Sequence, residues 1–306
     1  MQTISSQGPA STIQAISSLL MTAVSNLYGY FCSKPVCIAE LVTPYMSKRG
    51  SFQNENCALD FSQAREASKP ITVRKSARSE VARDEIGREK LCLSQIESDH
   101  VVQLLEETEN SITMNDAGMD LMDLMSELQG PLPGHIFRAV STQFAQGLLD
   151  THNAGVCHND LKPDNLAIDA DGVVRIIDFG HASSPSADLG MPGEFGTDGY
   201  KAPEYFHAPE ELSEQSDIFA AGVTLCELLT GNNFMPAATS SMNAAQVNTK
   251  ICEDQNYFER YVTSYLKNTA SKLGRYKPLI AQMLSWDPSK RPTAEQFQAA
   301  LKELHQ

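Results

Sequence analysis

Residues 158–165, HNDLKPDN, gather two acids, a lysine and two amides in one short stretch. Asp160 can accept the proton of a hydroxyl group, Lys162 can neutralise a transferring anion, and Asn165 offers an oxygen ligand for a hard cation. A further acid, Asp178, follows in a DFG motif. Each residue alone would be an ordinary solvated loop residue. An acid, a lysine two residues later and an amide five residues later are a set that could act together, so the question is whether the rest of the chain supplies the other parts of a site.

Two local elements must position these side chains. Apolar residues recur at three- and four-residue steps over residues 136–152, which predicts a helix that closes at Gly155. The later segment LAIDADGVVRIIDFG reads as an apolar run, an Asp-Gly turn and a second apolar run, which is typical of a β-hairpin. The helix therefore leads into Asp160, and the hairpin separates it from Asp178.

The composition is that of a globular protein with one large domain or two lobes: 306 residues, 42% hydrophobic and 20% charged. A net charge of −14 argues against nucleic acid as a partner, because phosphate binding requires an excess of Lys and Arg, and it favours a basic protein or peptide. The seven cysteines are scattered and form no CxxC pair, which favours reduced thiols and a cytoplasmic location.

The first 33 residues carry no charged side chain, and their apolar residues recur at helical steps. They lack the positive region of a signal peptide, and several Ser, Thr and Asn residues interrupt the apolar run, so we expect no transmembrane segment. The favoured interpretation of residues 1–44 is a docking helix or partly disordered leader. The alternative is an export leader, because its composition resembles that of bacterial effectors secreted into a host cell cytosol.

Five motifs follow one another along the chain: HNDLKPDN, DFG, GTDGYKAPE at 196–204, SDIFAAG at 216–222 and WDPSKRPTA at 286–294. In this order and spacing the sequence resembles the eukaryotic-type serine/threonine protein kinase family from about residue 45 to its end. The resemblance implies an α+β, two-lobed kinase-like fold, with a β-rich N-lobe over 45–117 and a larger helical C-lobe over 118–306. It also implies ATP and Mg²⁺ as cofactors and transfer of the γ-phosphate to a Ser or Thr hydroxyl of a protein substrate.

The same resemblance assigns roles within the C-lobe. Asp160 would accept the proton of the substrate hydroxyl, and Lys162 would stabilise the transferring phosphoryl group. Asn165 and Asp178 would bind Mg²⁺ through oxygen atoms. Thr197 would bridge Asp160 and Lys162 in the substrate-binding loop.

In the N-lobe, ITVRK alternates Val73 and Lys75 on one strand face, which would direct Lys75 towards the phosphates and place Val73 over adenine. A helix is predicted within DEIGREKLCLSQI, and DHVVQLLE, residues 99–106, reads as a strand. The family pattern makes Glu89 the ion-pair partner of Lys75, and Glu85, one turn earlier, is the competing choice.

The stretch NSITMNDAGMD resembles the strand and hinge that clamp the adenine edge. On this alignment Met114 is the gatekeeper and Asn115 to Ala117 form the hinge. Asp120 lies near the ribose, and Ala167 forms the floor of the pocket.

Two departures from the family pattern stand out. The only candidate for the glycine-rich loop is RGSFQNENCALD, which keeps Gly50 but lacks the other glycines. ATP is then held less tightly, or the amide side chains of Gln53, Asn54 and Asn56 substitute for the missing backbone contacts.

The second departure is Asn159, where many regulated kinases carry an arginine that pairs with a phosphate. We therefore expect activity without phosphorylation of residues 181–201, although the segment offers serine hydroxyls at Ser183, Ser184 and Ser186.

Three further contacts are expected in the C-lobe. Glu204 and Arg291 would form a buried ion pair, Asp217 would accept hydrogen bonds from the catalytic-loop backbone, and His158 would pack in the core rather than act as an acid or base.

Two other functions compete with an active kinase. A kinase-fold pseudokinase or scaffold would bind nucleotide or a partner without catalysis, and only the altered glycine loop favours it. A small-molecule phosphotransferase would share Asp160 and Asn165 but would be expected to lack Lys162 and GTDGYKAPE.

Overall fold

The computed structural model describes residues 52–61, 72–184, 195–208, 213–235 and 243–306. The predicted leader, residues 1–44, lies outside these residues, as do Gly50 and Ser186. Within the described part of the chain, no helix combines the length and apolar character needed to cross a membrane.

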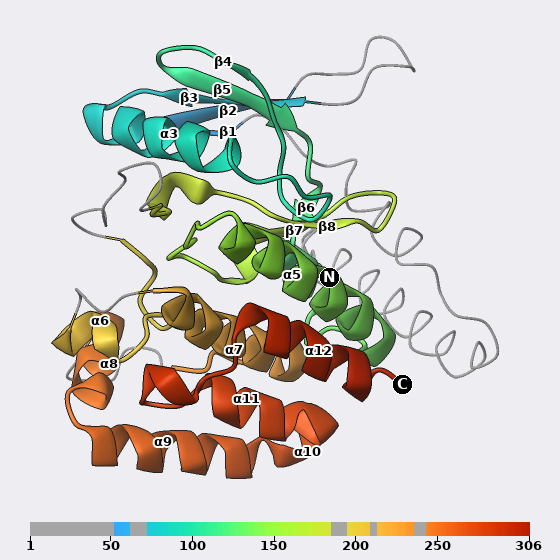
Figure 1. Ribbon diagram of the computed structural model, residues 1–306, viewed down its shortest axis with the longest axis vertical. Coiled ribbons are helices and arrows are strands. Elements are labelled where there is room, and N and C mark those ends of the chain that lie inside the picture. The colour runs from blue at the N-terminus through green and yellow to red at the C-terminus, as the bar shows by residue number, and fades with distance from the viewer. Residues whose placement is uncertain (1–51, 62–71, 185–194, 209–212, 236–242) are drawn as a thin grey trace, which may run out of the picture. The chain divides into compact units, whose positions relative to one another are not determined.

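The N-terminal part is a five-stranded antiparallel sheet in the order β1-β2-β3-β5-β4. Its strands are β1 (Phe52–Gln53), β2 (Cys57–Phe61), β3 (Thr72–Ala77), β4 (Leu104–Glu107) and β5 (Ser111–Asn115). One helix, α3 (Glu80–Leu93), follows β3 and packs on the sheet (Figure 1). Its start is set by Ser79, whose side chain accepts a hydrogen bond from Ala82 N and so satisfies one of the free amides of the first turn.

The C-terminal part is mainly helical and includes a small sheet of three short strands, β6 (Met119–Asp120), β7 (Leu166–Ile168) and β8 (Val174–Ile176). Its helices are α4 (Leu121–Leu128), α5 (Gly134–Asn153), α6 (Glu204–His207), α7 (Glu214–Thr230), α8 (Ala244–Cys252), α9 (Gln255–Asn268), α10 (Ala270–Leu273), α11 (Lys277–Met283) and α12 (Ala294–Leu304). A β-rich part followed by a helical part confirms the expected α+β fold class.

The predicted strand over residues 99–106 begins later than expected, at Leu104. The residues before it contact the other part of the molecule instead: Val101 forms a bridge with Ile176 of β8, and Val102 N donates to Ile176 O at 3.0 Å. The expectation was wrong here because an apolar run does not tell which neighbour its backbone groups will bind.

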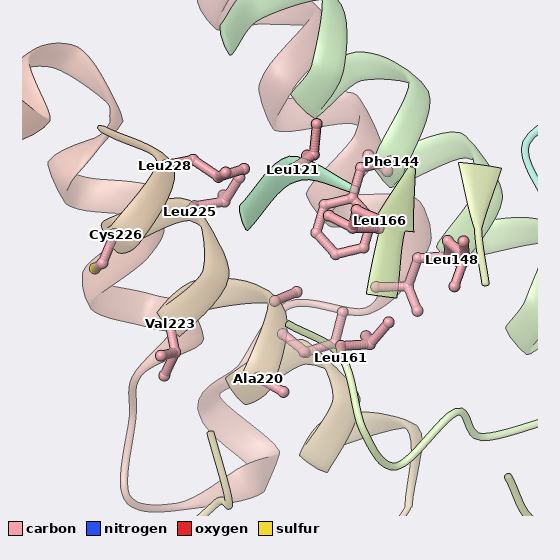
Figure 2. Packing of buried hydrophobic residues seen from close by; sticks show 14 of the residues in the cluster. Leu121, Phe144, Leu148, Leu161, Leu166, Ala220, Val223, Leu225, Cys226 and Leu228 are labelled. Carbon is pink, nitrogen blue, oxygen red and sulfur yellow. The ribbon is translucent and has the colours of Figure 1, made fainter. Parts of the chain in front are cut away.

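Helix α7 lies in the core of the helical part and is buried along most of its length. Figure 2 shows side chains of α7 gathered with Phe144 of α5, Leu161 and Leu166. Leu161 and Leu166 are fully buried, and burial of one such side chain is worth about 1.5–3 kcal/mol. They flank residues 162–165, so the core anchors both ends of the stretch that carries Lys162 and Asn165.

Candidate active site

The loop after α5 is held from behind by Asp217 of α7. Its carboxylate accepts hydrogen bonds from His158 N and Asn159 N, both at 2.8 Å, and lies 3.0 Å from Nε2 of His152. Asp217 is buried, so these donors replace the water that its carboxylate loses on folding. The loop that leads into Asp160 is thereby fixed to the buried helix.

Asp160, Lys162, Asn165 and Thr197 form one hydrogen-bonded group. Lys162 Nζ lies 2.9 Å from Asp160 Oδ2 and 2.6 Å from Thr197 Oγ1. Thr197 Oγ1 donates to Asp160 Oδ1 at 2.7 Å, and Asn165 Nδ2 donates to Asp160 O at 2.7 Å. The structure thus brings a residue of the GTDGYKAPE motif onto the carboxylate of Asp160, with a lysine beside it.

A second group joins the two parts of the molecule through Lys75. Its Nζ lies 2.8 Å from Glu89 Oε2 of α3 and 2.7 Å from Asp178 Oδ1. The partner of Lys75 on α3 is therefore Glu89, while Glu85 also lines the cavity and forms no ion pair with Lys75 among the described contacts. Glu89 also accepts a hydrogen bond from Phe179 N at 3.2 Å, which ties α3 to the DFG motif.

In this second group the charged side chains change one another's pKa values. The ammonium of Lys75 holds the pKa of Asp178 well below its usual range. Burial lowers the pKa of Lys75, but the carboxylates of Asp178 and Glu89 outweigh that effect and raise it above its usual value. Burial raises the pKa of Glu89, and the ion pair with Lys75 opposes this. Lys75 and Asp178 therefore carry opposite charges at neutral pH.

Lys75, Glu89 and Asp178 of the second group, together with Asn165 of the first, line a cavity of about 480 Å³, a size typical of small-molecule sites. The residues that the sequence predicted for the adenine side all line it, namely Val73, Met114, Asn115, Ala117, Asp120 and Ala167. Val73 lies opposite Met114 in the register of β3 and β5. Residues that are far apart in the chain therefore lie side by side on the adenine side of the cavity.

The cavity also includes residues that the sequence argument did not single out. Cys57, Leu59 and Phe61 line it from β2, and their alternate spacing in CALDF is the signal that could have identified them. Gly118 lines it after the predicted hinge. It has φ +99°, and a Cβ there would lie 1.9 Å from Ile168 O, so the hinge approaches β7 as closely as only glycine allows.

The turn between β1 and β2 replaces the expected glycine-rich loop. Asn54 Oδ1 accepts hydrogen bonds from Asn56 N at 2.8 Å and Cys57 N at 2.7 Å, and Asn54 N donates to Cys57 O at 2.9 Å. Three of the four backbone N–H groups of residues 54–57 therefore donate hydrogen bonds within the turn. Among the described residues, positive φ outside glycine occurs only at Gln129, Asn159 and Asp178, so this turn requires no glycine.

The three amide side chains of this turn have different surroundings. Gln53 Oε1 accepts from Arg78 Nη1 at 3.3 Å, and Asn54 Oδ1 is occupied by the turn itself. Asn56 lines the cavity, and its side chain makes no hydrogen bond to another residue that the structure describes. Asn54 lines the cavity as well, and among the described contacts only its Oδ1 is engaged in the turn, so the side-chain N–H donors of both Asn54 and Asn56 remain available to a ligand.

Known proteins give an independent comparison. The protein kinase domain matches residues 56–301. The chain belongs to the protein kinase family. Similar proteins include cyclin-dependent kinase F-3 of Oryza sativa subsp. japonica, 29% identical over 229 residues that cover 68% of this chain and 53% of that protein. Mitogen-activated protein kinase pmk-1 of Caenorhabditis elegans is 29% identical over 58% of this chain and 51% of its own length.

A third relative, mitogen-activated protein kinase 13 of Homo sapiens, is 28% identical and covers 83% of this chain and 76% of its own length. This chain spans about half the length of the first two relatives. All three share with this chain the family to which its motif order pointed.

In this chain the segment after the DFG motif is held by contacts from the catalytic loop and from Arg88 of α3, whose Nη1 donates to Ala182 O at 3.2 Å. Asn159 has φ +63°, a conformation that asparagine tolerates well. Its Nδ2 donates to His181 O at 2.9 Å and to Ser183 Oγ at 3.0 Å. The backbones of Cys157 and Ser183 also exchange two hydrogen bonds at 2.9 Å.

The expectation that serine hydroxyls of this segment are available for modification is wrong for two of the three. Ser183 and Ser184 are buried, and Ser184 Oγ donates to Gln95 Oε1 at 3.2 Å. A hydroxyl packed in this way cannot enter another enzyme's active site unless the segment first opens. Ser183 contacts Asn159 of the catalytic loop and Ser184 contacts Gln95, which follows α3, and the local sequence reveals neither contact.

Two remaining expectations concern the kinase core. Glu204 and Arg291 are both buried, and Arg291 Nη2 lies 2.7 Å from Glu204 Oε2. Removing one partner would strand a buried charge, at a cost of about 3–5 kcal/mol. His158 is buried, its Nε2 lies 2.9 Å from Ile177 O, and its ring packs edge-on against Phe179. His158 supports the DFG motif and does not face the cavity.

Proposed function

We propose that this chain is an ATP- and Mg²⁺-dependent serine/threonine protein kinase that transfers the γ-phosphate to a hydroxyl group of a protein substrate. The observation that carries the proposal is a pair of groups: Lys75 bound to both Glu89 and Asp178 in the cavity, and Asp160 bound to both Lys162 and Thr197. Asn165 lines the cavity and donates to Asp160 O, so it connects the two groups. One group suits the nucleotide phosphates, and the other suits an incoming hydroxyl.

Each side chain has a role that its surroundings support. Lys75 binds the phosphates, and Glu89 keeps its ammonium directed at the cavity. Asp160 orients the substrate hydroxyl and accepts its proton. Lys162 neutralises the charge on the transferring group, and Thr197 holds Lys162 and Asp160 in place. On the adenine side, Ala117 supplies backbone hydrogen bonds, because Asn115 N already donates to Gln103 O at 3.2 Å.

The residues present fit Mg²⁺. Asn165 and Asp178 both line the cavity, and Asn165 Nδ2 donates to Asp160, which directs its Oδ1 away from that contact. An amide oxygen and a carboxylate are the hard ligands that Mg²⁺ prefers. Bound there, Mg²⁺ would neutralise phosphate charge.

The kinase needs no phosphate on residues 181–201 to be active. Asn159 binds the segment through neutral hydrogen bonds, and an uncharged amide cannot form the charge-assisted fork that arginine makes with a phosphate.

A basic protein or peptide is the preferred substrate class. The whole chain carries a net charge of −14, and such an excess of carboxylates attracts cationic partners and raises their local concentration. Positive residues near the acceptor Ser or Thr would therefore strengthen binding.

The experiment is transfer of labelled γ-phosphate from ATP and Mg²⁺ to a serine peptide flanked by arginines, with a glutamate-flanked peptide for comparison. The wild type is expected to label the arginine peptide, and Asp160→Asn and Lys75→Met to lose at least about a hundredfold in rate. EDTA should abolish labelling.

A scaffold that binds nucleotide without catalysis is the second candidate, and the internally bonded turn of residues 54–57 favours it. Nucleotide binding by a wild type that labels neither peptide nor itself would establish the scaffold instead.

A further inference from the structure

His181 connects three parts of the site, although it belongs to none of the groups described above. It directly follows the DFG motif, and its side chain is partly exposed. Its Nδ1 accepts a hydrogen bond from Gly196 N at 3.2 Å and lies 3.8 Å from Asp160 Oδ2. On the other side of the ring, Nε2 lies 3.9 Å from Glu85 Oε1 of α3.

These contacts define the protonation of the neutral ring. A ring nitrogen that accepts a hydrogen bond from a backbone N–H carries no proton, so the proton of neutral His181 is on Nε2. That N–H faces the carboxylate of Glu85, at a distance too long for a direct hydrogen bond but favourable electrostatically. The backbone of His181 is fixed as well, because its carbonyl accepts from Asn159 Nδ2.

The hydrogen bond from Gly196 matters because of the residue that follows it. Gly196 has φ +71°, and a Cβ there would lie 3.0 Å from Asn159 O, so the backbone is confined at this point. The next residue is Thr197, whose hydroxyl contacts both Asp160 and Lys162. An anchor on Gly196 therefore sets where Thr197 Oγ1 meets the carboxylate of Asp160.

We propose that His181 is a positioning residue for the hydroxyl-acceptor side of the site. Its Nδ1 holds Gly196, and through it Thr197, in register with Asp160 and Lys162. The nucleotide side does not depend on it, because Lys75, Glu89 and Asp178 bind one another without His181. The proposal rests on the proposed kinase function and adds a residue to the acceptor side.

The test distinguishes the contribution of Nδ1 from that of Nε2. Asparagine places a hydrogen-bond acceptor near the position of Nδ1, whereas glutamine places its amide near the position of Nε2. His181→Asn, His181→Gln and His181→Leu are therefore compared with the wild type on an arginine-flanked serine peptide. His135→Gln, which changes an exposed histidine at the start of α5, is the matched control.

His181→Gln and His181→Leu are expected to lose about tenfold in kcat/KM for the peptide, the effect of one hydrogen bond in the active site. Their KM for ATP should stay within about twofold of wild type, and His181→Asn should recover most of the loss. Thermal melting checks that each variant is folded, and His135→Gln should match wild type in every measurement.

Three results would overturn the inference while leaving the kinase function intact. These are an unchanged kcat/KM for the peptide in His181→Leu, an equal rise in the KM for ATP, or equal activity of the Asn and Gln variants. A wild type that transfers no phosphate would instead refute the proposed function, and this inference with it.

Discussion

Asn159 Nδ2 lies 3.0 Å from Oγ of Ser183, and this contact fastens the segment after the DFG motif to the catalytic loop. Neither group is charged, and Ser183 is buried. The same amide also donates to His181 O. The segment is therefore held by the folded chain itself, where a regulated kinase of the family pattern would use an arginine and a phosphate.

The first prediction concerns this contact. Protein treated with a phosphatase should keep its rate within about twofold, whereas Ser183→Glu should be inactive and destabilised by about 1–3 kcal/mol, because it buries a carboxylate beside groups placed for a hydroxyl. Peptide labelling and chemical denaturation measure the two effects. Ser183→Ala is the control, since it removes one hydrogen bond without adding charge. Loss of activity on phosphatase treatment would contradict the prediction.

The second prediction compares the two acids of α3. Glu89→Gln should lower kcat/KM for ATP by about tenfold or more, because Lys75 loses the carboxylate that orients it. Glu85→Gln, one helical turn away, should change the KM for ATP by less than about twofold, since Glu85 makes no ion pair with Lys75 among the described contacts. Steady-state kinetics at varied ATP concentration measures both effects. Equal losses of kcat/KM for ATP in the two variants would refute the assignment of Glu89.

The third prediction concerns the turn that replaces the glycine-rich loop. Asn56→Ala should weaken ADP binding by about tenfold and leave adenosine binding unchanged, because Asn56 lines the cavity and a hydrogen bond from its amide to a charged phosphate would be worth about 1.5–3 kcal/mol. Asn56→Asp keeps the shape of the side chain but adds negative charge, so it should weaken ADP binding further.

Calorimetric titration of adenosine and ADP separates this effect from a general loss of the pocket. Glu55→Gln, an exposed change in the same turn, should bind both ligands as the wild type does. If Asn56→Ala binds ADP as tightly as wild type, the phosphates are held without this amide.

Short-range signals in the sequence determined much of this protein. The Asp-Gly turn predicted the β7–β8 hairpin, where Gly172 has φ +77°, and apolar spacing predicted α5. The order of five motifs predicted the kinase fold and family. Each of these motifs and turns consists of residues a few positions apart, so it can be recognised in the sequence without knowledge of the fold.

The tertiary structure alone decided which distant groups meet. Glu85 and Glu89 are one turn apart on the same helix; the family pattern favoured Glu89, and the packing of α3 against β3 is what brings its carboxylate to Lys75. His181 and Gly196 are 15 residues apart in the chain and meet through one hydrogen bond, and no local pattern marks His181. Ser183 and Ser184 look like accessible hydroxyls in the sequence, but both are buried in the folded chain. These outcomes depend on packing between elements, and hydrophobic periodicity does not encode that geometry.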